Sequence, residues 1–322
     1  MTGTAPIEGV YLSATLDIEQ HIGAAFDAHR GAIRLRRPED IDDPKAVRFA
    51  VAWQPSDFAF ERYPNVKMVA SIAAGVDSIV NCPSLPDDAV VTRVRDDSQG
   101  DLMAGFAAWH VIWHHRAMQV HLDAQAQGRW RRQRFDNVVR PRDCPVGILG
   151  FGLMGRAVAR AVTGMGFPVI AAVRSAPKGE AMPGVSFETG PGSAQRTAAR
   201  ARMLINVLPL TEATRDILSA GLFDQMPMGA VLIQLGRGEH LVEADLDAAL
   251  DSGRLSAASL DVFRREPLPP EHPWWRDPRI LITPHQASDT APELVARQIA
   301  RAVHEVMDGR TPDTAVDRAS GY

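Results

Sequence analysis

The chain has 322 residues, of which 45% are hydrophobic and 23% are charged, and its formal net charge is −4. This composition is ordinary for a folded protein and excludes a disordered chain, a collagen-like repeat and a coiled-coil rod. The mild acidity argues against nucleic acid or an anionic membrane as the main partner. The length predicts about two domains.

The two cysteines, Cys82 and Cys144, are too few for a disulfide framework. A reducing, cytoplasmic location is therefore expected. Residues 1–9 lack the basic and apolar regions of a signal peptide. No apolar run approaches the ~18–20 residues of a transmembrane helix, so we expect no membrane partner.

Short apolar runs alternate along the chain with longer stretches of helical period. The runs predict strands at 9–14, 47–53, 66–72, 89–94, 146–150, 169–173, 203–208, 230–235, 257–262 and 280–283. The helical stretches are 17–29, 99–128, 153–165, 243–252 and 292–307. This alternation predicts an α/β, doubly wound fold. We expect the last helix to pack on the N-terminal part, because a lone helix cannot bury its apolar stripe.

A glycine-rich turn follows the strand at 146–150. The residues GILGFGLMGR contain G-x-G-x-x-G, with glycines at Gly150, Gly152 and Gly155. The first permits a tight turn, the second lets the backbone approach a pyrophosphate, and the third allows close packing of helix on strand. The following helix offers free N–H groups to phosphates. A dinucleotide site is predicted, with a purely structural turn as the alternative.

The end of the next strand indicates which dinucleotide is bound. An NAD-binding protein usually has Asp or Glu there to hold the ribose 2′-hydroxyl, whereas this chain has Arg174 and Ser175. A guanidinium and a hydroxyl suit a 2′-phosphate. NADP(H) is therefore the expected cofactor, with NAD(H) possible and with a plain surface role for Arg174 as the alternative.

Three further motifs follow strands in the second half of the chain. They are LGRGEH around Arg237, LDVFRREPLP around Asp261 and Glu266, and ITPHQAS around His285. Open parallel sheets place their ligands at this end of the strands. Taken singly, Arg237 could be a surface residue in a turn, Glu266 a loop cap and His285 a satisfied core histidine.

Together, these motifs and VLPLTEATRDIL resemble the D-isomer-specific 2-hydroxyacid dehydrogenase family, and within it the glyoxylate/hydroxypyruvate reductase A branch. The resemblance is strongest over residues 145–288 and extends more loosely over nearly the whole chain. It implies a Rossmann cofactor domain at 105–288. It also implies a flavodoxin-like substrate domain formed by 1–104 and 289–322.

The resemblance also assigns the chemistry. Arg237 would hold the carboxylate and ketone oxygens of a 2-oxoacid and stabilise the negative charge that develops there. His285 would donate the proton to the ketone oxygen, and Glu266 would orient the ring and favour its charged form. The expected reaction is the reduction of glyoxylate or hydroxypyruvate by NADPH.

Other site residues carry over by position. Backbone amides at Ala74 and Gly75 match the substrate-carboxylate loop, with an ordinary strand-to-helix turn as the alternative. Trp53 would limit the side group of the substrate, and Trp275 would either add to that wall or pack in the core. The remaining predicted cofactor contacts are Met103, Leu153, Met154, Leu208, Pro209, Thr214, Leu235, Gly236, Asp261, Ala287 and Ser288.

Two further signals receive less weight. His110, His114, His115 and His121 share one predicted helix, but they lack a convincing third ligand, so no metal is expected. The basic run 129–134 resembles the family's arm around a partner subunit, so we expect a homodimer and no nucleic acid. Three alternatives remain: a bulkier 2-oxoacid, a nucleotide-sensing transcriptional corepressor and a metal-dependent enzyme.

Overall fold

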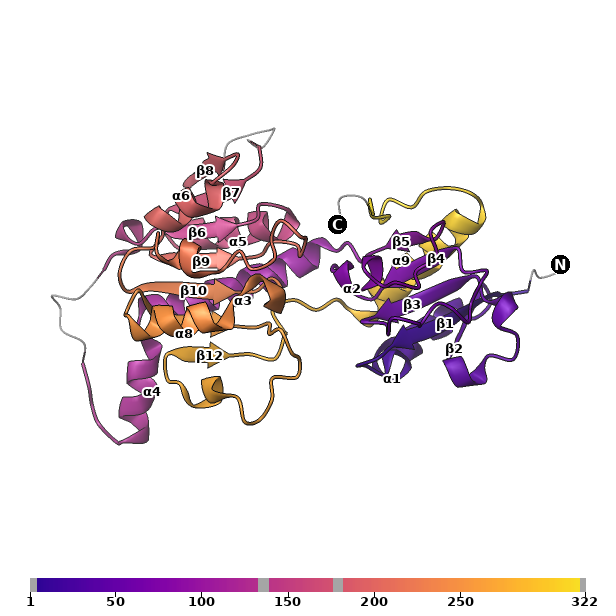
Figure 1. Cartoon of the computed structure of the whole chain (residues 1–322), viewed down its shortest axis with the longest axis horizontal. Helices are drawn as coiled ribbons and strands as arrows, with labels where there is room; N and C mark the ends of the chain where they lie inside the picture. The colour runs from indigo at the N-terminus through magenta and orange to yellow at the C-terminus, as the bar shows by residue number, and fades with distance from the viewer. Residues whose placement is uncertain (1–4, 133–138, 176–181, 319–322) are drawn as a thin grey trace. The chain divides into compact units, whose positions relative to one another are not determined.

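The computed structural model describes residues 5–132, 139–175 and 182–318, which form two compact units (Figure 1). Unit 1 comprises Met1–Asp96 and Asp289–Tyr322, and unit 2 comprises Asp97–Ser288. The chain passes from unit 2 to unit 1 after Ser288. The other crossing lies eight residues earlier than the predicted 104/105, because helix α3 begins at Asp97 and packs on α5 of unit 2. No helix in the described part of the chain has the length and apolar character needed to cross a bilayer.

Unit 1 is built on a five-stranded parallel sheet with the order β2-β1-β3-β4-β5. Its strands are β1 (Ile7–Ser13), β2 (Ile33–Arg36), β3 (Phe49–Trp53), β4 (Met68–Ser71) and β5 (Val90–Thr92). Its helices are α1 (Ile18–Ile22), α2 (Asp77–Val80) and α9 (Pro292–Met307), with the 3-10 helix η1 (Gly23–His29) after α1.

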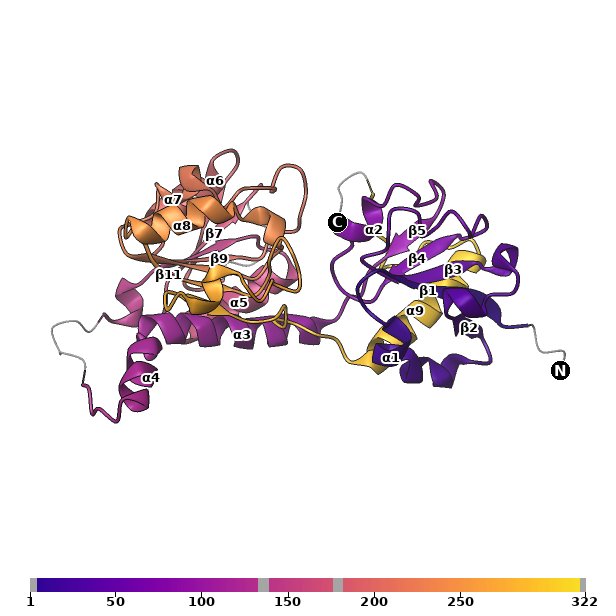
Figure 2. The ribbon, with the colours of Figure 1, turned by 60° about the horizontal axis from the view of Figure 1, so that its bottom comes forward.

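Alternate strand residues of unit 1 enter different hydrophobic clusters. Val51 and Met68 pack with apolar residues of α1, η1 and α9, whereas Ala50 and Val69 pack with α2 and the loops around it. This alternation is the two-residue period of a strand buried on both faces. The last helix packs on the N-terminal part, as predicted (Figure 2).

Unit 2 has a seven-stranded parallel sheet with the order β12-β11-β10-β9-β6-β7-β8. The strands are β6 (Val146–Leu149), β7 (Val169–Val173), β8 (Val185–Thr189), β9 (Met203–Asn206), β10 (Ala230–Gln234), β11 (Leu255–Leu260) and β12 (Ile280–Ile282). The helices are α3 (Asp97–His115), α4 (Met118–Ala126), α5 (Leu153–Gly164), α6 (Ser193–Arg200), α7 (Ala220–Phe223) and α8 (Glu243–Asp251).

The helices of unit 2 cover both faces of its sheet. Apolar residues of α3 and α5 form one cluster with the sheet, and those of α6, α7 and α8 form the other. Figure 2 shows these two helical layers on opposite sides of the strands. The strand order reverses between β6 and β9, and such a switch point is where ligands bind in open α/β sheets. The predicted doubly wound α/β fold is confirmed.

The structure corrects several predicted elements. Two edge strands, β2 and β8, and the helix α6 were not expected. The helix predicted at 99–128 is broken at Ala117, whose φ of 46° lies in the left-handed region, and the helix predicted at 17–29 changes to 3-10 geometry at Gly23.

Candidate active site

The carboxyl edge of the unit 2 sheet gathers the residues predicted to react. Arg237 follows β10, Asp261 follows β11, and His285 lies in the loop after β12. These strands are neighbours in one parallel sheet, so their carboxyl ends meet at the same edge. Glu266 reaches His285 from the chain that leaves β11.

His285 and Glu266 form a hydrogen-bonded pair. Nδ1 of the ring lies 2.8 Å from Oε2 of the carboxylate, and the two side chains are 31% and 25% exposed. Oε1 of the carboxylate accepts a hydrogen bond from the amide of Phe263 at 2.9 Å. The carboxylate is thus held at both oxygens, and it fixes the ring through Nδ1, so Nε2 is the nitrogen directed away from Glu266.

The charge state of Glu266 follows from its surroundings. Burial alone would raise the pKa of Glu266, but the hydrogen bond and charge of His285, the amide of Phe263 and the charge of Arg237 together lower this pKa below its usual range. The carboxylate therefore remains ionised beside the ring. An anion in that position stabilises the protonated imidazole, which is the form that can donate a proton.

The backbone of His285 is held in an unusual conformation. Its φ of 55° lies in the left-handed region, which costs a residue other than glycine about 1–3 kcal/mol. The amide of His285 donates to the carbonyl of Asp261 at 2.7 Å, which helps to hold this conformation.

The side chain of Asp261 fastens the same loop. Its buried carboxylate accepts hydrogen bonds from the hydroxyl of Thr283 at 2.6 Å and from the amides of Gln286 and Ala287 at 3.0 and 2.9 Å. These donors lie on both sides of His285. Asp261 therefore positions the catalytic loop, and its expected contact with the nicotinamide stays a prediction.

Arg237 presents its guanidinium from a partly buried, extended backbone. Its φ and ψ are −139° and 147°, and its Nη1 donates to the carbonyl of Gly236 at 2.8 Å. Its positive charge contributes to the lowered pKa of Glu266, so the guanidinium lies within electrostatic reach of the carboxylate. The structure therefore brings together an anion-binding group and an acid–base pair.

The glycine-rich turn joins β6 to α5. Gly150 has a φ of 98°, which favours glycine, and a Cβ on Gly155 would overlap the carbonyl of Gly150. A Cβ on Gly152 would meet nothing within 4 Å, and no side chain caps the N-terminus of α5. The turn therefore leaves room for a group that approaches the helix N-terminus, as a pyrophosphate would.

Arg174 and Ser175 directly follow β7, and both are exposed. β7 is the neighbour of β6 in the sheet, so these residues share the edge of the glycine-rich turn. Leu153 and Met154 form the first turn of α5, with the side chain of Leu153 exposed. The structure thus gathers the residues predicted to bind the phosphates.

The other predicted cofactor residues lie in unit 2 as well. Leu208 and Pro209 follow β9, and the hydroxyl of Thr214 donates to the carbonyl of Pro209 at 2.8 Å. Ser288 donates to the carbonyl of Gln99 at 2.9 Å. The buried residues of this set are Met103, Leu235, Gly236 and Ala287. Their contacts with a nucleotide stay predictions.

Three predicted substrate residues share the carboxyl edge of the unit 1 sheet. Trp53 ends β3, and the loop after β4 contains Ala74 and Gly75. In that loop the hydroxyl of Ser71 donates to the carbonyl of Gly75 at 2.7 Å and accepts from the amide of Ala73 at 3.1 Å. The small side chains leave the backbone accessible, as anion binding through amides requires.

Trp275 belongs to the 3-10 helix η7 (Pro273–Arg276) of unit 2. Its indole N–H donates to the carbonyl of Pro269 at 2.9 Å, and the residue is 50% exposed. The hydrogen bond orients the ring toward its own loop. Its role in limiting the substrate stays a prediction.

The histidines predicted to share a helix divide between α3 and α4. His110 and His114 both lie within hydrogen-bond distance of the Ser259 hydroxyl, at 2.9 and 2.7 Å. Within 5–132, 139–175 and 182–318, no cluster of three or more His, Cys, Asp or Glu side chains is arranged to hold a metal.

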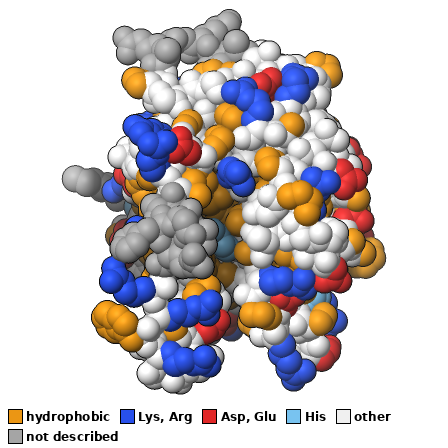
Figure 3. Space-filling view, turned by 90° about the vertical axis from the view of Figure 1, so that its left-hand side faces the viewer, with side chains coloured by type: hydrophobic (Ala, Val, Ile, Leu, Met, Phe, Trp, Pro, Cys, Tyr) orange, Lys and Arg blue, Asp and Glu red, His pale blue; other side chains and the backbone are white. Residues whose placement is uncertain are grey.

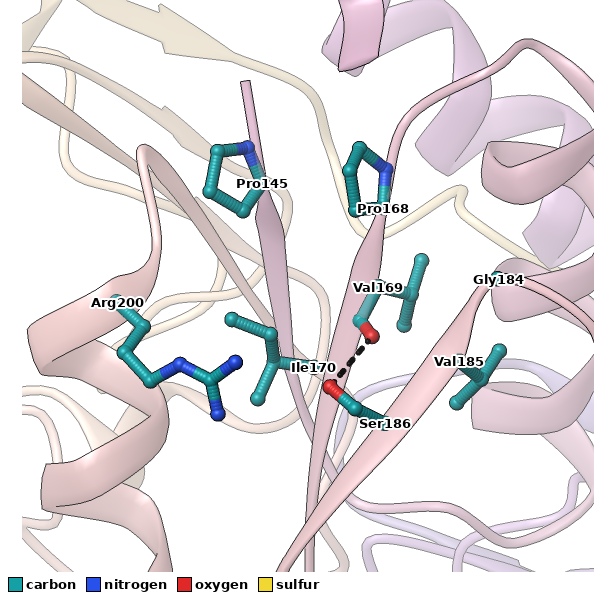
Figure 4. Close-up of a pocket in the computed structure, with 8 residues that line it drawn as sticks. All are labelled: Pro145, Pro168, Val169, Ile170, Gly184, Val185, Ser186 and Arg200. Atoms are coloured by element: carbon teal, nitrogen blue, oxygen red, sulfur yellow. Dashed lines mark hydrogen bonds between the residues drawn. The ribbon is translucent and has the colours of Figure 1, made fainter. Parts of the chain in front are cut away.

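A surface pocket of unit 2 lies at the opposite edge of the sheet (Figure 4). Its volume is about 400 Å³, and Pro145, Pro168 and Gly184 line it immediately before β6, β7 and β8. These are the amino ends of the strands. Because ligands of open parallel sheets bind at the carboxyl ends, this pocket is separate from the candidate active site.

Three buried polar residues behind Arg237 were not predicted from the sequence. Asn206 and Gln234 end the strands β9 and β10, and His240 lies in the 3-10 helix η6 (Gly238–His240). A signal was present, since each strand is an apolar run that ends in an amide side chain.

Comparisons with known proteins show the family of the chain. Residues 108–287 match the family model described as "D-isomer specific 2-hydroxyacid dehydrogenase, NAD binding domain". A glyoxylate/hydroxypyruvate reductase A from Serratia proteamaculans is 37% identical over 290 residues, covering 87% of this chain and 89% of the relative.

Two solved structures are similar over nearly their full length. One is a D-isomer specific 2-hydroxyacid dehydrogenase from Xanthobacter autotrophicus Py2 in complex with NADPH and MES, with 34% identity and a TM-score of 0.87, covering 99% of this chain and 100% of that one. The other is an NADPH-dependent glyoxylate/hydroxypyruvate reductase from Sinorhizobium meliloti in complex with NADP and sulfate, with 30% identity and a TM-score of 0.87, covering 98% and 99%. The chain therefore belongs to the D-isomer specific 2-hydroxyacid dehydrogenase family, and it is an oxidoreductase.

Proposed function

We propose that this enzyme reduces a small 2-oxoacid, glyoxylate or hydroxypyruvate, to the D-2-hydroxy acid with NADPH. The observation that carries the proposal is the grouping of Arg237 with the hydrogen-bonded pair of Glu266 and His285 at the carboxyl edge of the unit 2 sheet. The glycine-rich turn lies at the same edge, because it follows β6. The similar proteins from Serratia proteamaculans and Sinorhizobium meliloti are glyoxylate/hydroxypyruvate reductases, which supports an activity of this kind.

Each of the three residues has a distinct task. Arg237 binds the carboxylate and ketone oxygens of the oxoacid and stabilises the negative charge that develops on the ketone oxygen. His285 donates a proton to that oxygen from Nε2, while Glu266 keeps the ring charged and oriented through Nδ1. NADPH, when bound, supplies the hydride.

The residues at the edge of unit 2 fit NADPH. The uncapped N-terminus of α5 and the open space at Gly152 suit the pyrophosphate. Arg174 and Ser175 suit the 2′-phosphate, since neither is an acid that would repel it. Replacing Arg174 by Ala should raise the KM for NADPH about tenfold and leave that for NADH nearly unchanged. An unchanged preference would exclude Arg174 as the discriminating residue.

Ala74 and Gly75 of unit 1 are the candidates for binding the substrate carboxylate through their amides, and Trp53 and Trp275 are the candidates for limiting its side group. The test is a panel of glyoxylate, hydroxypyruvate and bulkier 2-oxoacids, with oxidation of NADPH followed by absorbance. The proposal requires the highest kcat/KM for the two small substrates. A maximum for a bulky oxoacid would overturn the substrate assignment while leaving the reaction type intact.

We also propose that the partner is a second copy of this chain. The face of unit 2 in Figure 3 mixes hydrophobic side chains with Lys and Arg. On α3, Trp109 is exposed and its ring lies 5.0 Å from that of Trp113, while Trp130 is 94% exposed after α4. Exposed aromatic residues among arginines are typical of interfaces. Residues 133 and 134 of the predicted arm lie outside the described residues.

Light scattering during size-exclusion chromatography tests the dimer, with twice the monomer mass expected and the monomer mass contradicting it. For the cellular location we propose a reducing compartment, the cytoplasm, because Cys82 and Cys144 are both free and buried.

A further inference from the structure

Three polar side chains with no exposed surface lie directly behind Arg237. They are Asn206 at the end of β9, Gln234 at the end of β10, and His240 in η6. We propose that they form a positioning unit that fixes the main chain of Arg237 and joins it to the segment Leu208–Pro209. This inference rests on the proposed function, because Arg237 acts there on the substrate.

The hydrogen bonds of His240 define its protonation. Nδ1 lies 3.0 Å from the amide nitrogen of Arg237, and an amide can only donate, so Nδ1 accepts. Nε2 lies 3.2 Å from the carbonyl oxygen of Pro209, which can only accept, so Nε2 carries the hydrogen. The ring is therefore neutral, and it connects the main chain of the substrate arginine to the strand end next to the predicted cofactor site.

Gln234 holds the carbonyl side of the same residue. Its Nε2 donates to the carbonyl of Arg237 at 2.8 Å, and its Oε1 accepts from the amide of Gly236 at 3.2 Å. The main chain is thus held at the amide of Gly236 and at both the amide and the carbonyl of Arg237. None of these bonds uses the side chain of Arg237.

Asn206 connects these two residues to each other. Its Nδ2 lies 2.8 Å from Oε1 of Gln234 and 3.0 Å from Nδ1 of His240, and its Oδ1 accepts from the amide of Leu208 at 3.3 Å. One amide side chain therefore contacts both supports of Arg237 and the segment after β9. The three residues form one connected network rather than separate pairs.

The glycines on either side of Arg237 show how closely the loop is pressed against its surroundings. A Cβ on Gly236 would lie 2.8 Å from Nδ2 of Asn206 and 2.8 Å from Nδ1 of His240. A Cβ on Gly238 would overlap the backbone of Phe263. Neither glycine has a positive φ, so close approach rather than backbone conformation explains them.

Satisfying buried polar groups is a general need of folding and would not by itself indicate a function. The specific feature here is where the network ends, which is on the amide and carbonyl of Arg237. A guanidinium binds an oxoacid in one geometry, and small displacements of such a group weaken binding strongly. A positioning role therefore predicts a change in oxoacid binding that exceeds any change in NADPH binding.

The test compares His240→Phe with His240→Asn. Phenylalanine removes the acceptor used by Arg237, and we expect the KM for the oxoacid to rise about tenfold. Asparagine places an oxygen near the position of Nδ1, and it should restore most of the loss. The Kd for NADPH, measured by fluorescence, should change less, because the carbonyl of Pro209 keeps its second donor, Thr214.

The matched control is His110→Phe. It makes the same exchange at a buried imidazole of unit 2, and Ser259 keeps His114 as a hydrogen-bond partner. This control should lower the thermal midpoint without raising the KM for the oxoacid. If both variants raise the KM equally, the effect is general destabilisation and the positioning role is wrong. Should His240→Phe not fold, Gln234→Met removes the other support, and an unchanged KM would overturn the proposal.

Arg237→Ala separates this inference from the proposed function. If this variant loses turnover, Arg237 acts as proposed, and an unchanged KM in folded His240→Phe then refutes the positioning role alone. If Arg237→Ala keeps turnover, both proposals fail. In the double variant, His240→Phe should add little to the loss caused by Arg237→Ala, because it acts through that residue. Full additivity would contradict the inference.

Discussion

In unit 2, His285 on the one hand and His110 and His114 on the other are hydrogen-bonded to the same short segment, residues 259–261. The amide of His285 donates to the carbonyl of Asp261, whereas the rings of His110 and His114 contact the hydroxyl of Ser259, two residues earlier. His285 is partly exposed and paired with a carboxylate, and the other two rings share one neutral hydroxyl beneath α3.

Burial determines the charge state of His110 and His114. It lowers the pKa of His110 to about 4, and burial together with repulsion from His110 lowers that of His114 to about 3. Both rings are therefore neutral at physiological pH and serve as hydrogen-bonding groups of the core. At the active site the ionised Glu266 offsets the cost of a charged ring. A histidine can act as an acid when it has a carboxylate partner and access to solvent. Its place in the sequence relative to a strand determines neither of these two properties.

The largest expected effect comes from removing the imidazole at the active site. His285→Gln should lower kcat roughly a thousandfold, because general acid catalysis contributes about 10²–10⁴-fold. The Kd for NADPH should stay near that of the wild type, and His110→Phe serves as the control with another ring removed. Turnover close to wild type in His285→Gln would show that another group donates the proton.

A smaller effect is expected when only the charge of the partner is removed. Glu266→Gln keeps the size of the side chain but no longer stabilises the protonated ring, and kcat for reduction should fall about 10–100-fold. Steady-state kinetics measure this loss, and an unchanged kcat would contradict the electrostatic role of Glu266.

The effect of acid pH on stability follows from the lowered pKa of Glu266. Because its folded pKa lies below the ordinary value of 4.5, the ion pair stabilises the fold fully above that value. The contribution is lost as the pH falls through the lowered pKa. Glu266→Gln should therefore reduce the acid sensitivity of unfolding below about pH 4.5.

Much of this site could be predicted from the sequence because its residues lie in short sequence motifs. Strand, glycine-rich turn and helix follow one another from Val146 to Gly164, and Arg237 and His285 each follow an apolar run. In a parallel sheet those runs end at one edge, so order along the chain already predicts proximity.

The features that were missed depend on partners distant in sequence. β2 reads IRLR, with charged residues at alternate positions, because an edge strand need not be buried on both faces. The network of Asn206, Gln234 and His240 depends on which strands are neighbours, since Asn206 and Gln234 pair across β9 and β10. The left-handed residue Ala117 carries no sequence signal for the break between α3 and α4.

The smallest expected effect concerns the buried His110 and His114, and it appears in the free energy of unfolding rather than in turnover. The folded pKa values of His110 and His114 lie below the ordinary 6.5, so the unfolded chain binds more protons as the pH falls. The stability that the neutral rings provide is complete above about pH 6.5 and is lost progressively toward pH 4. The loss is of the order of 2 kcal/mol per ring.

His110→Phe should remove one of these two contributions. Urea unfolding at about pH 7.5 and about pH 5 gives the free energy of unfolding at each pH, and the difference should be smaller in the variant than in the wild type. The exposed His304 of α9 supplies the control, since replacing it by Gln removes an imidazole that water already surrounds. An equal pH dependence in wild type and His110→Phe would mean that the ring titrates alike in the folded and unfolded chain. The difference between His110 and His285 would then be due to the carboxylate of Glu266 alone.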